Sequence, residues 1–345
     1  MRFSLFFFAA DAAAGRTGSY DLLLDGARFG DRNGLEAVWT PERHFHRFGG
    51  LYPSPAVAGA AIASVTERIA VRGGSVVAPL HDVLRIAEDW AVLDNLSRGR
   101  AGLSLASGWR EEDFELRPGA FEDRNALTID AITSLRRLWA GEGIDRGRAG
   151  TVSTFPAPVD GPLPLWLTAA SKPATFRAAG EAGVGVLTHL MMQSFDDLAE
   201  RISEYRDALR SSDRSAEGCV TLMLHTYLAD DVERAQQVVA APLENYLMDA
   251  LGLFRSVSDP VDESSAARSR LAVRRASSRV MADGLIGTPE STMEVVRRCA
   301  AIGVDEIACL IDFGVADDAV MESLERVADL STAANRSAAT GALVS

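Results

Sequence analysis

Histidine and lysine side chains recur directly after short apolar runs of this 345-residue sequence. His44, His46, His189 and His225 are four of the five histidines, and each follows or closes such a run. Lys172 is the only lysine, and it also comes shortly after an apolar run. Because imidazole titrates near neutrality and an ammonium group binds anions, these side chains could manage protons and hold a negatively charged ligand.

The loop 171–175 (SKPAT) has the composition of an anion-binding helix start. Pro173 suits the first helical position, and the free N–H groups that follow it can bind a negative group. The hydroxyls of Ser171 and Thr175 add donors, and Lys172 adds a positive charge. A simple N-cap turn has the same spacing, so both interpretations stay open.

Two further segments could lie against a flat ligand. Ser107, Gly108 and Trp109 leave a predicted strand, where Gly108 permits a close backbone approach and Trp109 offers a flat apolar surface. Arg110 adds a cation, although an ordinary core tryptophan and a solvated arginine have the same pattern. Residues 72–75 (RGGS) place two glycines inside a strand, which indicates either a close ligand or a β-bulge.

Alternating strands and helices must position these residues. Eight apolar runs predict strands over residues 2–8, 35–39, 69–78, 101–105, 165–169, 185–190, 219–228 and 307–311. Helical patterns lie between them, over residues 20–33, 53–67, 83–96, 121–140, 173–182, 195–209, 232–251 and 315–333, and Thr288 with Pro289 begins another. Near-continuous apolar strands are typical of a parallel sheet covered on both faces.

The count of eight strands favours an α/β fold with a single (β/α)8 TIM barrel over an open doubly wound sheet. No GxGxxG follows a strand, which argues against a dinucleotide-binding fold. We predict one domain over residues 1–333, with an insertion at 141–164, a lid at 252–283 and a flexible tail at 334–345. Barrel active sites lie at the carboxyl ends of the strands, where the histidines and the lysine fall.

Charge and composition limit the partners and the compartment. A net charge of −13 argues against nucleic acid and anionic membranes as partners. The first apolar run is too short for a secretory signal, and no 18-residue apolar span exists. Three cysteines without a CxxC motif indicate a reducing, cytoplasmic location and neither a disulfide framework nor a zinc site.

Several of these segments together resemble the bacterial-luciferase-like flavin-dependent monooxygenases, in the branch found beside polyketide and nonribosomal-peptide assembly lines. The resemblance covers residues 2–330 and rests on segments 40–46 (TPERHFH), 73–77 (GGSVV), 85–89 (RIAED), 93–100 (LDNLSRGR), 107–114 (SGWREEDF), 121–124 (FEDR), 188–190 (THL) and 303–307 (GVDEI). It implies an enzyme that uses reduced FMN (FMNH2) from a separate flavin reductase, with O2 as co-substrate.

The resemblance also implies the contacts of the flavin. Its phosphate is expected near Arg124, Lys172 and Thr175, and its isoalloxazine near Gly74, Ser75 and Trp109, with a cis peptide between residues 74 and 75. Ser107, Gly108 and Ser171 complete the predicted cofactor contacts.

Two departures from the luciferase pattern argue against light emission. Arg43 stands at the first position of the luciferase histidine pair, so that only His44 matches, and Ser107 replaces a phosphate-binding arginine, whose charge Lys172 could restore. The implied mechanism forms a C4a-hydroperoxyflavin that the protein shields from water. His44 is the predicted catalytic residue and would hold or transfer a proton while the substrate is hydroxylated or receives oxygen beside a carbonyl.

Three alternatives remain at this stage. An amidohydrolase-like metal barrel would use His44, His46, Lys172, His189, His225 and Asp312, but its H-x-H motif belongs after the first strand and here follows the second, so no metal is predicted. An F420-dependent oxidoreductase of the same superfamily and a non-catalytic flavin-binding subunit are the other two.

The predicted partners are a small-molecule or carrier-protein-tethered substrate, a natural-product intermediate, and a second copy of the chain. Residues 56–63 (AVAGAAIA) make one helix apolar on most sides. Such a helix needs two packing partners, so we predict a two-fold homodimer.

Overall fold

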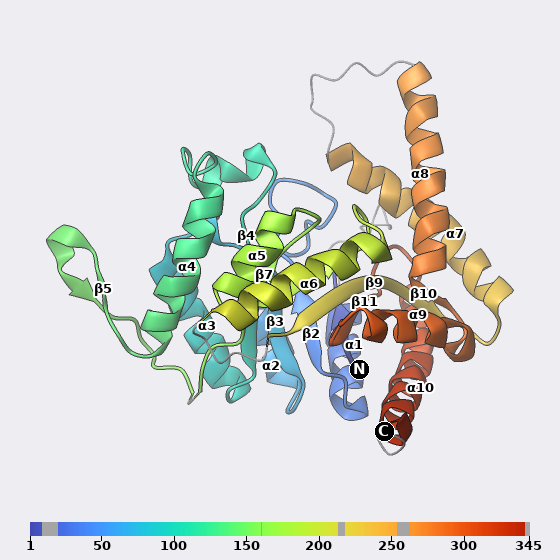
Figure 1. Ribbon diagram of the computed structural model, residues 1–345, viewed down its shortest axis with the longest axis horizontal. Helices are drawn as coiled ribbons and strands as arrows, with labels where there is room; N and C mark the ends of the chain where they lie inside the picture. Colours follow the sequence, from blue (N-terminus) through green and yellow to red (C-terminus); the bar gives the residue numbers. More distant parts are fainter. Residues whose placement is uncertain (9–19, 160, 213–217, 254–262, 342–345) are drawn as a thin grey trace.

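The computed structural model describes residues 1–8, 20–159, 161–212, 218–253 and 263–341, and its parallel strands close into a barrel (Figure 1). The sheet runs β10-β9-β11-β1-β2-β3-β4-β7-β8, and a further pairing of β8 with β9 closes an eight-stranded ring. Its strands are β1 (Arg2–Phe6), β2 (Ala37–Thr40), β3 (Ala70–Val77), β4 (Ala101–Ala106), β7 (Leu165–Thr168), β8 (Gly185–His189), β9 (Val220–Leu228), β10 (Leu285–Gly287) and β11 (Glu306–Leu310). The predicted (β/α)8 barrel is therefore confirmed.

Helices follow the strands and surround the barrel. They are α1 (Asp21–Asn33), α2 (Pro55–Val65), α3 (Val83–Ser97), α4 (Arg124–Trp139), α5 (Pro173–Glu181), α6 (Phe195–Ser211), α7 (Val232–Leu253), α8 (Glu263–Asp283), α9 (Pro289–Ala301) and α10 (Asp317–Gly341), with short 3-10 turns η1 (Ala78–Leu80), η2 (Glu111–Leu116) and η3 (Gly147–Ala149). The start of α9 matches its sequence, because the Thr288 side chain accepts a hydrogen bond from Ser291 N and Pro289 begins the helix. None of the described helices is long and apolar enough to span a membrane.

Strand β10 was not predicted. It pairs in parallel with the end of β9, beside the ring of eight. Its three residues are all buried and are too few for an apolar run to stand out from the flanking helices. The sequence analysis therefore missed it.

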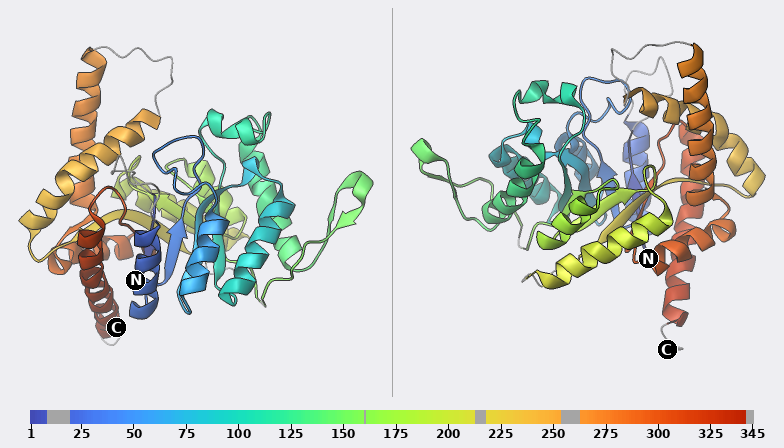
Figure 2. Two further views of the ribbon diagram at one scale, coloured as in Figure 1. Left: turned by 180° about the vertical axis from the view of Figure 1, so that it is seen from behind. Right: turned by 45° about the horizontal axis from the view of Figure 1, so that its top comes forward.

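The two predicted inserts have different structures. Residues 141–164 contain an antiparallel hairpin of β5 (Ile144–Asp145) and β6 (Thr151–Val152), which projects from the flank opposite α7 and α8 (Figure 1). Within the predicted lid, residues 254–262 lie outside the described part of the chain, residues 252–253 end α7 and α8 forms the rest, so the lid stays a prediction. In both views of Figure 2, α8 rises beyond the strand ends of the barrel. Helix α10 extends to Gly341, into the segment for which a flexible tail is predicted.

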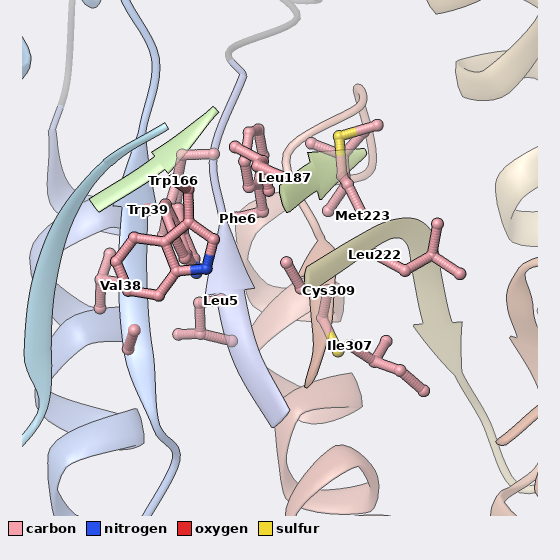
Figure 3. Close-up of a cluster of buried hydrophobic side chains, with 14 of the residues drawn as sticks. Leu5, Phe6, Val38, Trp39, Trp166, Leu187, Leu222, Met223, Ile307 and Cys309 are labelled. Carbon is pink, nitrogen blue, oxygen red and sulfur yellow. The ribbon is translucent and has the colours of Figure 1, made fainter. Parts of the chain in front are cut away.

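A buried ion pair lies inside the barrel. Glu306 of β11 is fully buried, and its carboxylate contacts Arg72 Nη1 at 2.8 Å. The same carboxylate accepts hydrogen bonds from Ser4 Oγ at 2.6 Å and Trp39 Nε1 at 3.0 Å. The Arg72 guanidinium lies 5.0 Å from the Trp39 ring and 4.7 Å from the Trp166 ring. Figure 3 shows these two indoles against each other in the barrel interior, beside apolar side chains such as Leu5 and Phe6.

We predict that Glu306→Ala lowers the free energy of unfolding by about 3–5 kcal/mol, because it leaves the Arg72 charge without its main buried partner. Urea unfolding of the variant measures this loss. Glu294→Ala is the control, since Glu294 is exposed and pairs with Arg297 on the surface of α9, and it should change stability by less than about 1 kcal/mol. Equal effects of the two substitutions would contradict a structural role for the buried pair.

Candidate active site at the barrel mouth

Three hydroxyl groups join neighbouring strands at the carboxyl end of the barrel. The peptide bond between Gly74 and Ser75 is cis, as the resemblance implies. Ser75 Oγ is hydrogen-bonded to Thr168 Oγ1, which also lies 2.7 Å from Ser104 Oγ. The structure therefore brings the predicted residue Ser75 together with two hydroxyls of β4 and β7 that were not predicted as site residues.

The glycines of β3 are required by the protein's own packing. A Cβ at Gly73 would lie 2.8 Å from the Trp90 ring, and one at Gly74 would lie 2.8 Å from the Trp39 ring. The β3–β4 register also shifts between Gly74 and Val76. Of the two interpretations of this segment, the bulge is the one that these contacts support.

The exit of β4 presents an exposed indole next to β3. Gly108 has a φ of +75°, and a Cβ there would lie 2.9 Å from Val77, so this turn needs glycine. The turn leaves the Trp109 side chain 43% exposed, while Ser107 is half-buried. An exposed indole beside a close backbone approach can accommodate a flat ring.

The predicted phosphate ligands lie at two helix starts on the same side of the barrel. Lys172 is the exposed N-cap of α5 and caps it with no side-chain hydrogen bond, and Ser171 and Thr175 beside it are half-buried. Arg124 is the first residue of α4, where its guanidinium lies 4.0 Å from the Phe121 ring and donates to Phe121 O at 2.6 Å.

Glu42 is a functional residue that the sequence analysis missed. Its buried carboxylate contacts His44 Nε2 at 2.8 Å and His81 Nε2 at 2.6 Å, and it accepts a hydrogen bond from Val77 N at 2.7 Å. It thus joins the loops that follow β2 and β3, and it orients His44. An acidic residue directly after a buried strand was the available signal for it.

This cluster shifts the pKa values of Glu42 and His81 away from their ordinary values. Burial raises the pKa of the Glu42 carboxyl, but hydrogen bonds from His44 and His81 outweigh burial and leave that pKa below its ordinary value. Burial likewise lowers the pKa of His81, and the hydrogen bond to Glu42 outweighs it, so the net pKa is raised. The hydrogen bond between Glu42 and His81 therefore favours an ionised Glu42 carboxylate with a protonated His81 imidazole beside it.

A metal hydrolase site does not form. Of the groups within the described residues, only Glu42, His44 and His81 lie close enough together to share a metal ion. Two residues of the amidohydrolase-like set form hydrogen bonds with different parts of the chain. His46 Nδ1 accepts a hydrogen bond from Phe48 N, and the Asp312 carboxylate accepts one from Phe8 N. The H-x-H and Asp312 are thus not gathered as that alternative requires.

Unpaired polar atoms concentrate at the mouth. Among the described residues, six buried side-chain atoms lack a hydrogen-bond partner. Four of them lie at or beyond the carboxyl ends of strands: Thr40 Oγ1, Arg43 Nε, Asp113 Oδ1 and Gln193 Oε1. A fifth, His225 Nε2, lies within β9 beside the last residue of β11. Buried polar groups in proteins are nearly always paired, so this cluster is a place where a ligand or ordered water would supply the partners.

A cavity of about 270 Å³ lies between the ends of β8 and β9 and helix α8, and His225 is the one described residue with an unpaired atom that lines it. Leu190, Met223 and Val280 are among its apolar lining residues, while His225 and Arg279 are polar ones. Burial holds the pKa of His189 at about 4 and that of His225 at about 3, so both imidazoles are neutral at pH 7. A neutral imidazole can either donate or accept a hydrogen bond here.

The family model for luciferase-like monooxygenases matches residues 1–306, so the chain belongs to this family. It is an oxidoreductase, a flavin-dependent monooxygenase. It is 26% identical to the oxygenase component of the flavin-dependent trigonelline monooxygenase from Acinetobacter baylyi, over 95% of this chain and 93% of that protein. It is 27% identical to the 4-hydroxyprotoasukamycin monooxygenase of Streptomyces nodosus, over 72% and 69% of the two chains.

Solved structures share the fold. The monooxygenase RslO1 from Streptomyces bottropensis superposes with a TM-score of 0.80 at 24% identity, covering 95% of this chain and 98% of that one. The oxygenating constituent of 3,6-diketocamphane monooxygenase from Pseudomonas putida, in complex with FMN, gives 0.76 at 17% identity, covering 95% and 96%. An F420-dependent secondary alcohol dehydrogenase gives 0.67 at 16% identity, covering 93% and 99%.

The buried imidazoles of His189 and His225 should destabilise the fold in mild acid. Their pKa values lie below the value of about 6.5 for an unfolded histidine. Since the unfolded chain binds these protons first, the free energy of unfolding should fall as the pH drops from 6.5 towards 4. At pH 5 we expect each imidazole to account for about 2 kcal/mol of the loss.

Denaturant unfolding of wild type and His225→Phe at pH 7, 6 and 5 tests this expectation. The raised pKa of His81 contributes with the opposite sign, since its stabilisation is present below pH 6.5 and is lost as the pH rises, but it does so in both proteins. The wild type should therefore lose more stability than the variant between pH 7 and pH 5. Parallel losses would show that His225 is accessible to protons in the folded state.

Proposed function

We propose that this protein is the oxygenase of a two-component system that uses FMNH2 and O2 to hydroxylate, or insert oxygen into, a small natural-product intermediate, free or tethered to a carrier protein. The observation that carries the proposal is the barrel mouth, which combines the cis Gly74–Ser75 bond, the exposed Trp109 indole and the cationic start of α5. The relative described as an oxygenase component supports a separate flavin reductase, and the structural neighbour in complex with FMN supports that flavin.

The residues of the mouth fit a flavin mononucleotide. The N–H groups at the start of α5, with Lys172, Ser171 and Thr175, suit a phosphate, and Arg124 would add a second charge. Gly74, Ser75, Ser107, Gly108 and Trp109 would border the isoalloxazine. When bound, reduced FMN supplies the electrons that activate O2 for transfer of one oxygen atom.

His44 would manage a proton beside the flavin. Its Nε2 contacts the Glu42 carboxylate at 2.8 Å, which fixes the orientation of the ring. Through Glu42 the imidazole is linked to His81, and this second imidazole offers a route for exchanging the proton with solvent. The Phe45 ring, centred 5.8 Å from the His44 imidazole, would limit the entry of water around it.

Oxygen-dependent consumption of NADH with a flavin reductase, measured together with product and peroxide, tests the proposed function. Turnover that needs O2 and yields oxygenated product supports a monooxygenase. Reduction that proceeds without O2 and needs F420 would instead identify an F420-dependent oxidoreductase, which the shared fold with the alcohol dehydrogenase keeps as the second candidate. Tight flavin binding without turnover would identify a non-catalytic subunit.

We predict that His44→Ala reduces product formation by roughly 10²–10⁴-fold, the range for loss of a positioned acid–base group, with little change in FMN affinity. His46→Ala is the matched control, because His46 lies in the same loop but contacts the backbone N–H of Phe48 and not Glu42. Equal losses in the two variants, or normal turnover of His44→Ala, would move the proton-handling role elsewhere.

We predict that the protein binds FMN in preference to FAD, and that Arg124→Ala and Lys172→Ala each weaken FMN binding by roughly 1–3 kcal/mol through loss of a charge-assisted bond. Fluorescence titration of the flavin measures both effects. Arg177→Ala is the control, since Arg177 is exposed on α5 and pairs with Glu204. Unchanged affinity in both site variants would refute the phosphate assignment.

We also propose a homodimer that is formed through α2 and α3. Val57 of α2 is 71% exposed, and Val92 and Leu96 of α3 are also exposed apolar residues. Light scattering at micromolar concentration should give twice the 36.9 kDa mass of one chain. Val57→Asp should shift the mass towards the monomer, because it places a charge in the buried interface. A monomeric wild type would contradict the proposal.

A further inference from the structure

Buried Arg43 and partly buried Arg110 share one buried carboxylate at the mouth. Arg43 Nη1 lies 3.8 Å from Asp113 Oδ2, and Arg110 Nη1 lies 3.5 Å from Asp113 Oδ1. The side chains of Arg43 and Asp113 are each only 8% exposed. The other acidic partner of Arg110 is Glu112, which is 57% exposed and hence largely screened by solvent. Arg43, Arg110 and Asp113 together therefore carry an excess of one positive charge, and the nearby Glu42 carboxylate is already hydrogen-bonded to His44 and His81.

The hydrogen bonding of this cluster is incomplete. Arg43 Nε and Asp113 Oδ1 are buried and have no hydrogen-bond partner. The 3.8 Å separation of Arg43 from Asp113 is also longer than an N–H···O hydrogen bond, which spans about 2.7–3.2 Å. A buried charge with weak pairing is costly, so its retention calls for a ligand that pairs with it.

Arg72 is a buried arginine with a structural role, and its contacts with carboxylates can be compared with those of Arg43. Its guanidinium contacts Glu306 at 2.8 Å and Glu36 at 2.9 Å, both within hydrogen-bond distance. The Arg43 side chain is equally buried, but its guanidinium has no carboxylate at such a short distance, since Asp113 lies 3.8 Å away. The difference indicates that Arg43 does not serve packing alone.

Aromatic rings border the Arg43 guanidinium. Its central carbon lies 5.7 Å from the centre of the Phe8 ring and 5.4 Å from that of Trp109. Phe48 and Tyr246 extend this surface, with their ring centres 5.0 Å apart. A planar apolar molecule with an anionic oxygen matches a guanidinium flanked by rings, because guanidinium pairs with planar oxyanions and the rings stack on the apolar part.

We propose that Arg43 recognises an anionic oxygen of the substrate, a carboxylate or a phenolate on a planar apolar body. The proposal rests on the proposed function only in placing the substrate at the barrel mouth. Arg43 follows β2, whereas the predicted phosphate ligands follow β4 and β7, so the two anionic groups would have separate partners. Arg110 adds to the positive potential, and Asp113 holds the two guanidinium groups in place.

Calorimetric titration of the FMN-saturated protein with 2-naphthoate and with its neutral analogue 2-naphthalenemethanol tests the proposal without turnover. Wild type should bind the carboxylate at least tenfold more tightly than the alcohol. Arg43→Gln should remove this preference, and Arg43→Lys should restore part of it. Arg28→Gln makes the same change of charge at an exposed pair on α1 and should leave the preference intact.

Asp113→Asn is expected to strengthen 2-naphthoate binding, which is opposite to the effect expected of Arg43→Gln. It therefore tests the same proposal even if Arg43→Gln fails to fold. Removing the buried carboxylate that faces both guanidinium groups should raise the affinity for 2-naphthoate several-fold and leave that for the alcohol unchanged. No preference in wild type, a preference that survives Arg43→Gln, or unchanged or weaker naphthoate binding in Asp113→Asn would overturn the proposal. Because binding is measured without reductase or O2, these outcomes are independent of whether the protein proves to be an oxygenase.

Discussion

The barrel is organised around one buried ion pair, between Arg72 of β3 and Glu306 of β11. Charges inside a protein are tolerated only when they are paired and hydrogen-bonded. Here Ser4 of β1 and Trp39 of β2 complete the hydrogen bonds of the carboxylate, and the indoles of Trp39 and Trp166 enclose the guanidinium. Side chains of five strands thus meet at one point, and this constraint fixes how the strands lie around the ring.

The mouth depends on that arrangement. Trp39, held by Glu306, occupies the space where a Cβ at Gly74 would lie, so the glycine of the cis peptide is required by the layer of the core below it. The same region of β3 places Ser75 against Thr168, which is also hydrogen-bonded to Ser104, and the three hydroxyls join three strands above the apolar core. The geometry of the proposed flavin site therefore follows from packing that has no direct part in binding.

Two buried carboxylates at the barrel mouth, those of Glu42 and Asp113, differ in how completely they are hydrogen-bonded. Around Glu42, a single buried carboxylate is fully used by two imidazoles and one backbone N–H, which makes a rigid link between the loops after β2 and β3. Around Asp113, a single buried carboxylate faces two guanidinium groups at distances too long for strong hydrogen bonds. Adjacent residues, Glu42 and Arg43, thus belong to one satisfied cluster and one unsatisfied cluster. We interpret the satisfied cluster as the one that positions His44, and the unsatisfied cluster as the one proposed to bind an anionic oxygen of the substrate.

The sequence by itself determined the elements, because apolar runs, helix periods and caps are local signals. The eight barrel strands, the start of α9 at Thr288 and, through resemblance, the cis Gly74–Ser75 bond were all predicted correctly. The short strand β10 was missed because three residues carry no period. The contacts of the site were decided only by the tertiary structure. Parallel pairing of β2 with β3, and of β3 with β4, brings His81 to Glu42 from 39 positions away and Arg43 to Asp113 from the loop after another strand. Such pairs join residues whose spacing in the sequence carries no information about their distance in space.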